Sequence, residues 1–160
     1  EDEPLGTAGA VKHAEKILGT SFLLLNGDTF CRVVVKDLME HHHNTKADLT
    51  LCAVKSEGIS DYGNIIADQD GIVLEFIEKE ESNSLSRGLT KYASAGYYLV
   101  NKSILSDVPA GQKFSLESDL FPRLTRIKTK VVVFLCDSFC DIGTPERLRT
   151  FRAKFPEVGY

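Results

Sequence analysis

The chain has 160 residues, of which 42% are apolar and 26% charged, and its formal net charge is −4. This length suits one hydrophobic core, so we expect a single domain over residues 1–160. The composition excludes a disordered chain, and no apolar run approaches the roughly 20 residues that cross a membrane. The charges are scattered, whereas a nucleic-acid surface needs clustered Lys and Arg. We therefore expect neither a membrane nor a nucleic acid as partner.

The cysteines indicate a reducing compartment. All four lie in or beside apolar, strand-like stretches, without a CxxC pair or a common zinc spacing: Cys31, Cys52, Cys136 and Cys140. The N-terminus has neither the basic stretch nor the apolar core of a signal peptide. We therefore expect reduced thiols in a cytoplasmic protein.

The first part of the chain predicts alternating helices and strands. Thr7 to Leu18 has apolar residues at helical spacing, and Gly19 follows where a C-cap belongs. Phe22 to Leu25 is continuously apolar, which is typical of a strand buried on both faces in a parallel sheet. Next come a helix over Asp37 to Thr45 and a strand over Ala47 to Val54, with one face formed by Leu49, Leu51 and Ala53.

The second part begins with a hairpin, in which Asp70 and Gly71 supply the turn between Gly63 to Ile66 and Ile72 to Ile77. The remaining expected elements are a polar loop at Ser82 to Gly88, a strand at Tyr92 to Val100, a short turn at Asn101 to Val108, a helix at Ser118 to Ile127 capped by Ser115 or Ser118, a buried strand at Val131 to Leu135, and a helix at Thr144 to Phe155 capped by Thr144. This order predicts an α/β sandwich with a mostly parallel sheet.

Two aspartates each follow an apolar stretch. Phe22 to Leu25 leads through Asn26 into Gly27 and Asp28, and Asp141 follows Phe139 and Cys140. Doubly wound folds bind ligands at the carboxyl ends of their strands, where carboxylates are natural Mg²⁺ ligands. If both strands end at one edge of the sheet, the two aspartates can converge on a metal that clamps a polyphosphate. Alternatively, Asp28 belongs to a strand-ending turn and Asp141 caps the last helix or its preceding turn.

Other polar groups have weaker signals. Gly6 and Thr7 start a helix whose free N–H groups could contact a ligand, or they form an ordinary N-cap. Glu78 and Lys79 could bind sugar hydroxyls and a phosphate, or belong to an exposed charge run. The histidines at 41–43 cannot share a metal, because neighbours on a helix do not face one another, and we expect them on a solvated face. Ser115 has no evident catalytic triad partners.

Seven segments in order, PLGTAGAV, LLNGDTF, DYGNI, FIEKE, YASAGYYLV, FSLESDLFP and FCDIGTPERL, resemble the sugar-1-phosphate nucleotidyltransferases, especially bacterial guanylyltransferases acting on heptose or mannose 1-phosphate. The resemblance implies a three-layer α/β/α sandwich, Rossmann-like, with a mixed, mostly parallel sheet and an inserted β-hairpin as a flap on the sugar side. The family's opening Gly-rich loop precedes the first of these segments and is not in this chain. We therefore expect the sheet to lack its first strand or strands and to expose an apolar edge.

The resemblance assigns roles to individual residues. Leu5, Gly6 and Thr7 match the loop that contacts the base, and Gly27 accompanies them in nucleotide binding. Asp28 and Asp141 match the two aspartates that hold Mg²⁺.

The sugar side is implied in the same way. Gly63 matches a sugar contact, and Glu78 and Lys79 match the pair that binds sugar hydroxyls and the sugar phosphate, with Lys79 also counted as catalytic. Ser94 and Gly96 stand where the family has an Asn-Ala-Gly segment, and the shorter Ser offers fewer hydrogen bonds to the sugar.

The implied partners are a nucleoside triphosphate and a sugar 1-phosphate, whose reaction gives a nucleotide sugar and pyrophosphate, of the GDP-heptose or GDP-mannose type. A homo-oligomer is compatible with the resemblance. The alternatives are a nucleotide- or sugar-binding or regulatory module without catalysis, an inactive fragment, and a structural α/β domain whose motifs are ordinary turns.

Overall fold

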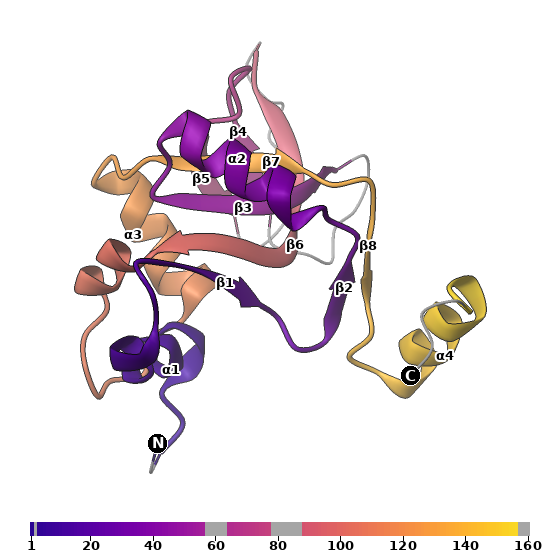
Figure 1. The fold of residues 1–160 in the computed structure, drawn as a ribbon, viewed down its shortest axis with the longest axis horizontal. Coiled ribbons are helices and arrows are strands. Elements are labelled where there is room, and N and C mark those ends of the chain that lie inside the picture. Colours follow the sequence, from indigo (N-terminus) through magenta and orange to yellow (C-terminus); the bar gives the residue numbers. More distant parts are fainter. Residues whose placement is uncertain (2, 57–63, 78–87, 157–160) are drawn as a thin grey trace.

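The computed structural model describes residues 1, 3–56, 64–77 and 88–156 (Figure 1). Its main sheet has the order β5-β4-β6-β3-β7, with β1 also paired to β6. The strands are β1 (Ser21–Leu25), β3 (Leu49–Lys55), β4 (Asn64–Ala67), β5 (Val73–Ile77), β6 (Thr90–Asn101) and β7 (Val131–Leu135). The long strand β6 has β3 along one edge, and along the other edge it has β4 at its first residues and β1 at its last.

The mixed α/β fold is confirmed, but the expectation of a mostly parallel sheet is wrong. Among the described strand pairs of this sheet, β3 with β7 is parallel, whereas β1–β6, β3–β6, β4–β5 and β4–β6 are antiparallel. An apolar run reflects the hydrophobicity of a strand and does not fix the direction of its neighbours. The direction is set here by β6, which follows the hairpin and runs back between β1 and β3.

Helices cover both faces of the sheet, which gives the expected three layers (Figure 1). One face packs against α1 (Gly6–His13), the π-helical turn η3 (Leu116–Leu120) and α3 (Phe121–Arg126), and the other against α2 (Val35–Thr45). Strand β3 alternates as predicted, with Leu49, Leu51 and Ala53 in the first core and Cys52 in the second. No helix of the described residues is long and apolar enough to cross a membrane.

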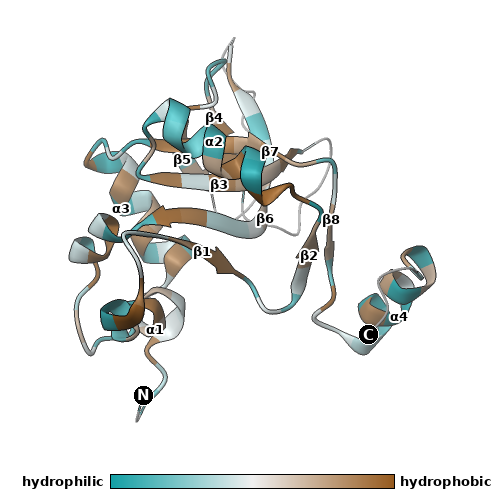
Figure 2. Ribbon diagram, in the orientation of Figure 1, coloured by the Kyte–Doolittle hydropathy of each residue, from teal (hydrophilic) through white to brown (hydrophobic). Residues whose placement is uncertain are grey.

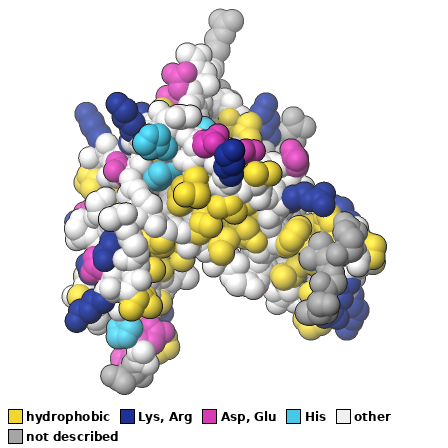
Figure 3. Space-filling model, viewed as in Figure 1, with side chains coloured by type: hydrophobic (Ala, Val, Ile, Leu, Met, Phe, Trp, Pro, Cys, Tyr) yellow, Lys and Arg dark blue, Asp and Glu magenta, His cyan; other side chains and the backbone are white. Residues whose placement is uncertain are grey.

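Strand β1 is not buried on both faces as expected. Leu23 is 38% and Leu25 49% exposed, whereas Phe22 and Leu24, on the opposite face of the strand, pack against the first core. In the described structure β1 has β6 as its only strand partner. The strand is strongly hydrophobic in Figure 2, and Figure 3 shows hydrophobic side chains gathered over it. Strand β1 thus exposes an apolar surface on one face, at the edge of the described sheet.

Most other elements agree with the predictions, with shifted ends. The hairpin of β4 and β5 turns at Gly71, which has a φ of +77°, and α4 (Pro145–Lys154) begins after the cap Thr144. The first helix is shorter than predicted, because α1 ends at His13 and a 3-10 turn, η1 (Glu15–Ile17), follows it. The predicted helix at 118–127 is divided into η3 and α3, capped by Ser115. The predicted turn after β6 is a 3-10 helix, η2 (Lys102–Asp107).

The expectation of solvated histidines is wrong for His42. This side chain is 7% exposed, and its ring nitrogens lie 2.7 Å from Thr50 Oγ1 and 3.1 Å from Asn101 Oδ1. Leu38 precedes it by one helical turn and lies in the core with it, so the face of α2 that carries both packs on the sheet. His42 therefore ties α2 to two strands.

Candidate active site

A small ribbon of two strands brings Asp28 and Asp141 together. Strand β2 (Thr29–Cys31) pairs antiparallel with β8 (Phe139–Asp141), so that Thr29 lies opposite Asp141. Beyond the ribbon, the Ile142 N–H donates to the Asp28 carbonyl at 2.7 Å. The two aspartates are thus neighbours because their segments pair, and not because two parallel strands end at one sheet edge. Strand β2 was not predicted, and β8 was anticipated only as an apolar stretch that ends at Asp141.

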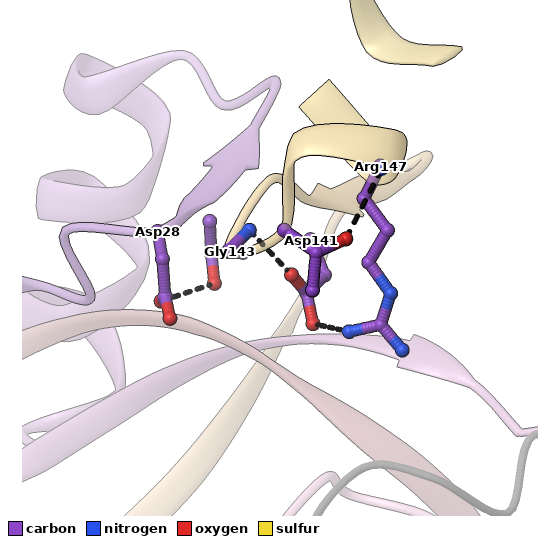
Figure 4. Close-up of polar contacts among 6 residues, drawn as sticks. Asp28, Asp141, Gly143 and Arg147 are labelled. Atoms are coloured by element: carbon purple, nitrogen blue, oxygen red, sulfur yellow. Dashed lines mark hydrogen bonds and ion pairs between the residues drawn. The ribbon is translucent and has the colours of Figure 1, made fainter. Parts of the chain in front are cut away.

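The carboxylates of Asp28 and Asp141 flank Gly143 (Figure 4). A methyl group on Gly143 would lie 3.1 Å from Asp28 Oδ2 and 3.2 Å from Asp141 Oδ1. Both oxygens therefore border the same small space, which is open because residue 143 has no side chain. A cation that contacts both carboxylates would therefore lie near Gly143.

The two carboxylates have different partners. Asp141 Oδ1 accepts a hydrogen bond from the Gly143 N–H at 2.8 Å, and Oδ2 forms an ion pair with Arg147 (Figure 4). Asp28 Oδ1 accepts a long hydrogen bond of 3.4 Å from the Thr29 hydroxyl. Asp141 thus also stabilises the turn before α4, one of the alternatives left open by the sequence, while Thr144 is the cap of the helix.

The two carboxylates of Asp28 and Asp141 suit Mg²⁺ better than they suit a metal whose ligands all come from the protein. The described residues contain no group of three or more His, Cys, Asp or Glu that could hold a metal ion. Mg²⁺ is commonly bound by one or two carboxylates and completes its octahedral shell with water and substrate phosphates. Asp28 and Asp141 match that pattern in number and in chemistry.

A cavity of about 550 Å³ opens on the Asp28 side of the pair. It is lined by Thr7, Leu24, Leu25, Asn26, Gly27, Asp28, Leu116 and Glu117. Thr7, Gly27 and Asp28 were predicted to bind the nucleotide or its metal. Asn26 and Glu117 were not assigned, although each lies within a segment that carries the family resemblance, which was the available signal.

The start of α1 differs from the expectation of free N–H groups. Ala8 and Gly9 donate to the Phe114 carbonyl at 2.9 and 3.1 Å, and the Leu5 carbonyl accepts from the Phe114 N–H at 2.9 Å. Gly6 has a φ of +70° and packs so closely on Phe114 that a methyl group would lie 2.8 Å from its carbonyl oxygen. Of the three predicted base contacts, Thr7 lines the cavity, whereas Leu5 and Gly6 hold α1 against the segment before η3.

Ser94 and Gly96 support the cavity from β6 and are not among the residues that line it. Gly96 has a φ of +68°, and its carbonyl accepts the Asn26 N–H at 2.8 Å. The Ser94 hydroxyl lies 3.3 Å from the Tyr98 hydroxyl, whose pKa is raised by burial. Three predicted residues, Gly63, Glu78 and Lys79, lie outside the described residues.

A second cavity, of about 670 Å³, lies between β8 and α4 on the Asp141 side. Its lining residues are Cys140, Asp141, Thr144, Glu146, Arg147, Thr150, Phe151 and Lys154. Helix α4 stands apart from the main sheet in Figure 1 and is held to the ribbon by aromatic packing. The ring centroid of Phe30 in β2 lies 4.9 Å from that of Phe151 and 5.7 Å from that of Phe155.

Comparison with known proteins gives consistent matches. A family model described as nucleotidyl transferase matches residues 1–157. The chain is 33% identical over 153 residues to the mannose-1-phosphate guanylyltransferase catalytic subunit beta of Drosophila pseudoobscura pseudoobscura, which covers 94% of this chain and 40% of that protein. It is 34% identical over 154 residues to the D-glycero-alpha-D-manno-heptose 1-phosphate guanylyltransferase of Aneurinibacillus thermoaerophilus, covering 93% and 62% of the two chains.

The fold matches a solved structure as well. A crystal structure of HddC from Yersinia pseudotuberculosis complexed with GMP-PN superposes with a TM-score of 0.76 at 33% sequence identity. The match covers 97% of this chain and 64% of HddC. This chain therefore spans between 40% and 64% of the length of these three relatives.

Proposed function

The chain belongs to the nucleotidyl transferase family, and we propose that it transfers GMP from GTP to a sugar 1-phosphate, with release of pyrophosphate. The observation that carries the proposal is the pairing of Asp28 and Asp141 on either side of Gly143, beside a cavity that Thr7 also lines. The names of the relatives support GTP as the donor and mannose or heptose 1-phosphate as the acceptor. The GMP-PN complex of HddC supports a guanine nucleotide.

In the proposed reaction, a phosphate oxygen of the sugar 1-phosphate attacks the α-phosphorus of GTP, and the bond to the pyrophosphate oxygen breaks. Such transfers depend on positioning and on neutralising charge more than on covalent chemistry. Asp28 and Asp141 would hold Mg²⁺, which when bound supplies the positive charge that the phosphates require. Thr7, Gly27 and the newly assigned Asn26 and Glu117 would position the ligands that enter the cavity.

The sugar side of the proposal depends on the family resemblance. Lys79 would neutralise the sugar phosphate, Glu78 would orient sugar hydroxyls, and Gly63 would allow the sugar to approach the backbone. Ser94 and Gly96 would contribute indirectly, since Gly96 holds the backbone of Asn26. We also propose that the reaction takes place in the cytoplasm, where free thiols such as those of this chain persist.

The proposal is tested by incubating the protein with GTP, Mg²⁺ and either mannose 1-phosphate or a heptose 1-phosphate, and by measuring pyrophosphate and GDP-sugar together. We expect both products in equal amounts, and a loss of at least about 100-fold in turnover for Asp28→Asn, because a metal ligand is removed. Asp37→Asn, which removes an exposed carboxylate from α2, is the matched control.

The outcomes separate the alternatives. GTP binding without product by the wild-type protein would favour a binding module without catalysis. Full turnover by Asp28→Asn at saturating Mg²⁺ would contradict the proposed role of the two aspartates.

A further inference from the structure

Arg147 forms an ion pair with the carboxylate of Asp141, one of the two aspartates of the candidate metal site. Its guanidinium pairs with Oδ2, while Oδ1 accepts the Gly143 N–H, so both oxygens of Asp141 have partners within the protein. Asp28, by contrast, has one long side-chain hydrogen bond among the described residues. The two carboxylates that border Gly143 are therefore not equally accessible to a cation.

The start of α4 places Arg147 next to Asp141. The Thr144 hydroxyl accepts the Arg147 N–H at 3.2 Å, which fixes the backbone of Arg147 in the first turn of the helix. The ion pair is partly exposed to water, since the Arg147 side chain is 47% and the Asp141 side chain 20% exposed. Exposed ion pairs contribute little in water, so a divalent cation can compete for Asp141.

The protein has room for the displaced guanidinium. Arg147 lines the cavity of about 670 Å³ between β8 and α4, together with Lys154 and Thr150. The side chain can therefore leave Asp141 while α4 keeps its cap and its packing on Phe30. Basic side chains are plentiful along this helix, as the space-filling view also shows (Figure 3).

We propose that Arg147 competes with bare divalent cations for the carboxylate of Asp141. Arg147 releases this carboxylate when the cation arrives bound to a polyphosphate. This inference rests on the proposed function, because the cation is the one that Asp28 and Asp141 share there. A bare cation must displace the guanidinium without compensation. A cation bound to phosphate brings anionic oxygens that can accept the hydrogen bonds of Arg147. Arg147 is thus a positioning residue that favours entry of the metal as its nucleotide complex.

The test measures the dissociation constant of Mn²⁺ by electron paramagnetic resonance, in the absence of nucleotide. We expect Arg147→Met to bind Mn²⁺ about two- to fivefold more tightly than the wild type, which is the range expected for release of one exposed ion pair. Arg149→Met is the matched control, because it removes the same charge from the exposed part of the same helix and should leave the affinity unchanged. For Mn²⁺ presented as its GTP complex, the gain of Arg147→Met should disappear.

Each other result overturns the inference. If Arg147→Met and the wild type bind Mn²⁺ equally and Asp28→Asn still loses binding, the competition by Arg147 is refuted and the proposed function is left intact. Equal increases in Mn²⁺ affinity in the Arg147 and Arg149 variants would show a general effect of charge instead of a specific competition by Arg147. An undiminished gain for the GTP complex would refute the exchange of partners. Absence of any Asp28-dependent binding, both of bare Mn²⁺ and of its GTP complex, would overturn the role of Arg147 and the proposed metal site together.

Discussion

Gly143→Ala probes the space between the two carboxylates more directly than removal of either one. The added methyl group would lie 3.1 Å from Asp28 Oδ2 and 3.2 Å from Asp141 Oδ1, closer than ordinary contacts between carbon and oxygen. Each oxygen must therefore move by a few tenths of an ångström. Mg²⁺ and similar ions demand near-ideal octahedral geometry, so a displacement of this size weakens both bonds.

The expected effect of Gly143→Ala separates binding from stability. Displaced ligand geometry typically lowers metal affinity about 10- to 100-fold, and we expect the dissociation constant of Mn²⁺ to rise by at least tenfold. Gly143 is exposed and lies outside the left-handed region, so its replacement should change the free energy of unfolding by less than about 0.5 kcal/mol.

The assay combines a Mn²⁺ titration followed by electron paramagnetic resonance with urea unfolding. Gly19→Ala is the control, since its methyl group would meet only Ser21 O at 3.4 Å and lies far from the site in the sequence. Wild-type Mn²⁺ affinity in Gly143→Ala would refute the inference that both carboxylates contact one ion at this position.

Two further predictions concern stability and reactivity. Gly96→Ala should lower the free energy of unfolding in urea by about 2 kcal/mol or more. A left-handed backbone at a residue with a side chain costs about 1–2 kcal/mol, and the methyl group would lie 2.8 Å from Asn26 Nδ2. An unchanged midpoint of urea unfolding would contradict this prediction. Cys136 should react with iodoacetamide before Cys31, because Cys31 is buried and Cys136 is partly exposed, and because the interaction of the two thiols lowers the pKa of Cys136 and raises that of Cys31. Peptide mapping at pH 7 measures the order in which the two cysteines are labelled. Cys31→Ala should slow the labelling of Cys136, and equal labelling rates of Cys136 with and without Cys31 would exclude the interaction.

Local patterns predicted most of the elements. The alternation of Leu49, Leu51 and Ala53 gave the correct face of β3, because one residue in two points toward the same core. Thr144 was predicted as the cap of α4 from its side chain and the following proline, and both interactions are local. Predictions of this kind depend on neighbours in the sequence alone.

Tertiary arrangement accounts for what was missed. The run at β1 was interpreted as fully buried and parallel, although hydrophobicity alone defines neither the direction nor the presence of a neighbouring strand. His42 was assigned to solvent, and its burial depends on which face of α2 meets the sheet.

The candidate site was predicted in part. Asp28 and Asp141 were selected together, but the strands beside them have only three residues each, too few to show alternation. The ion pair of Asp141 with Arg147 joins a residue before the helix to one inside it, and no local rule indicates it.

The proposed function depends above all on Asp28 and Asp141, which together would hold the divalent cation of a nucleotidyl transfer site. The most direct measurement is anomalous diffraction from crystals grown with Mn²⁺ and a non-hydrolysable GTP analogue. We expect one strong peak beside Gly143, from an ion that is directly coordinated by an oxygen of each aspartate and by phosphate oxygens of the analogue. A cation bound to the analogue but coordinated by only one aspartate, or by neither, would contradict this arrangement.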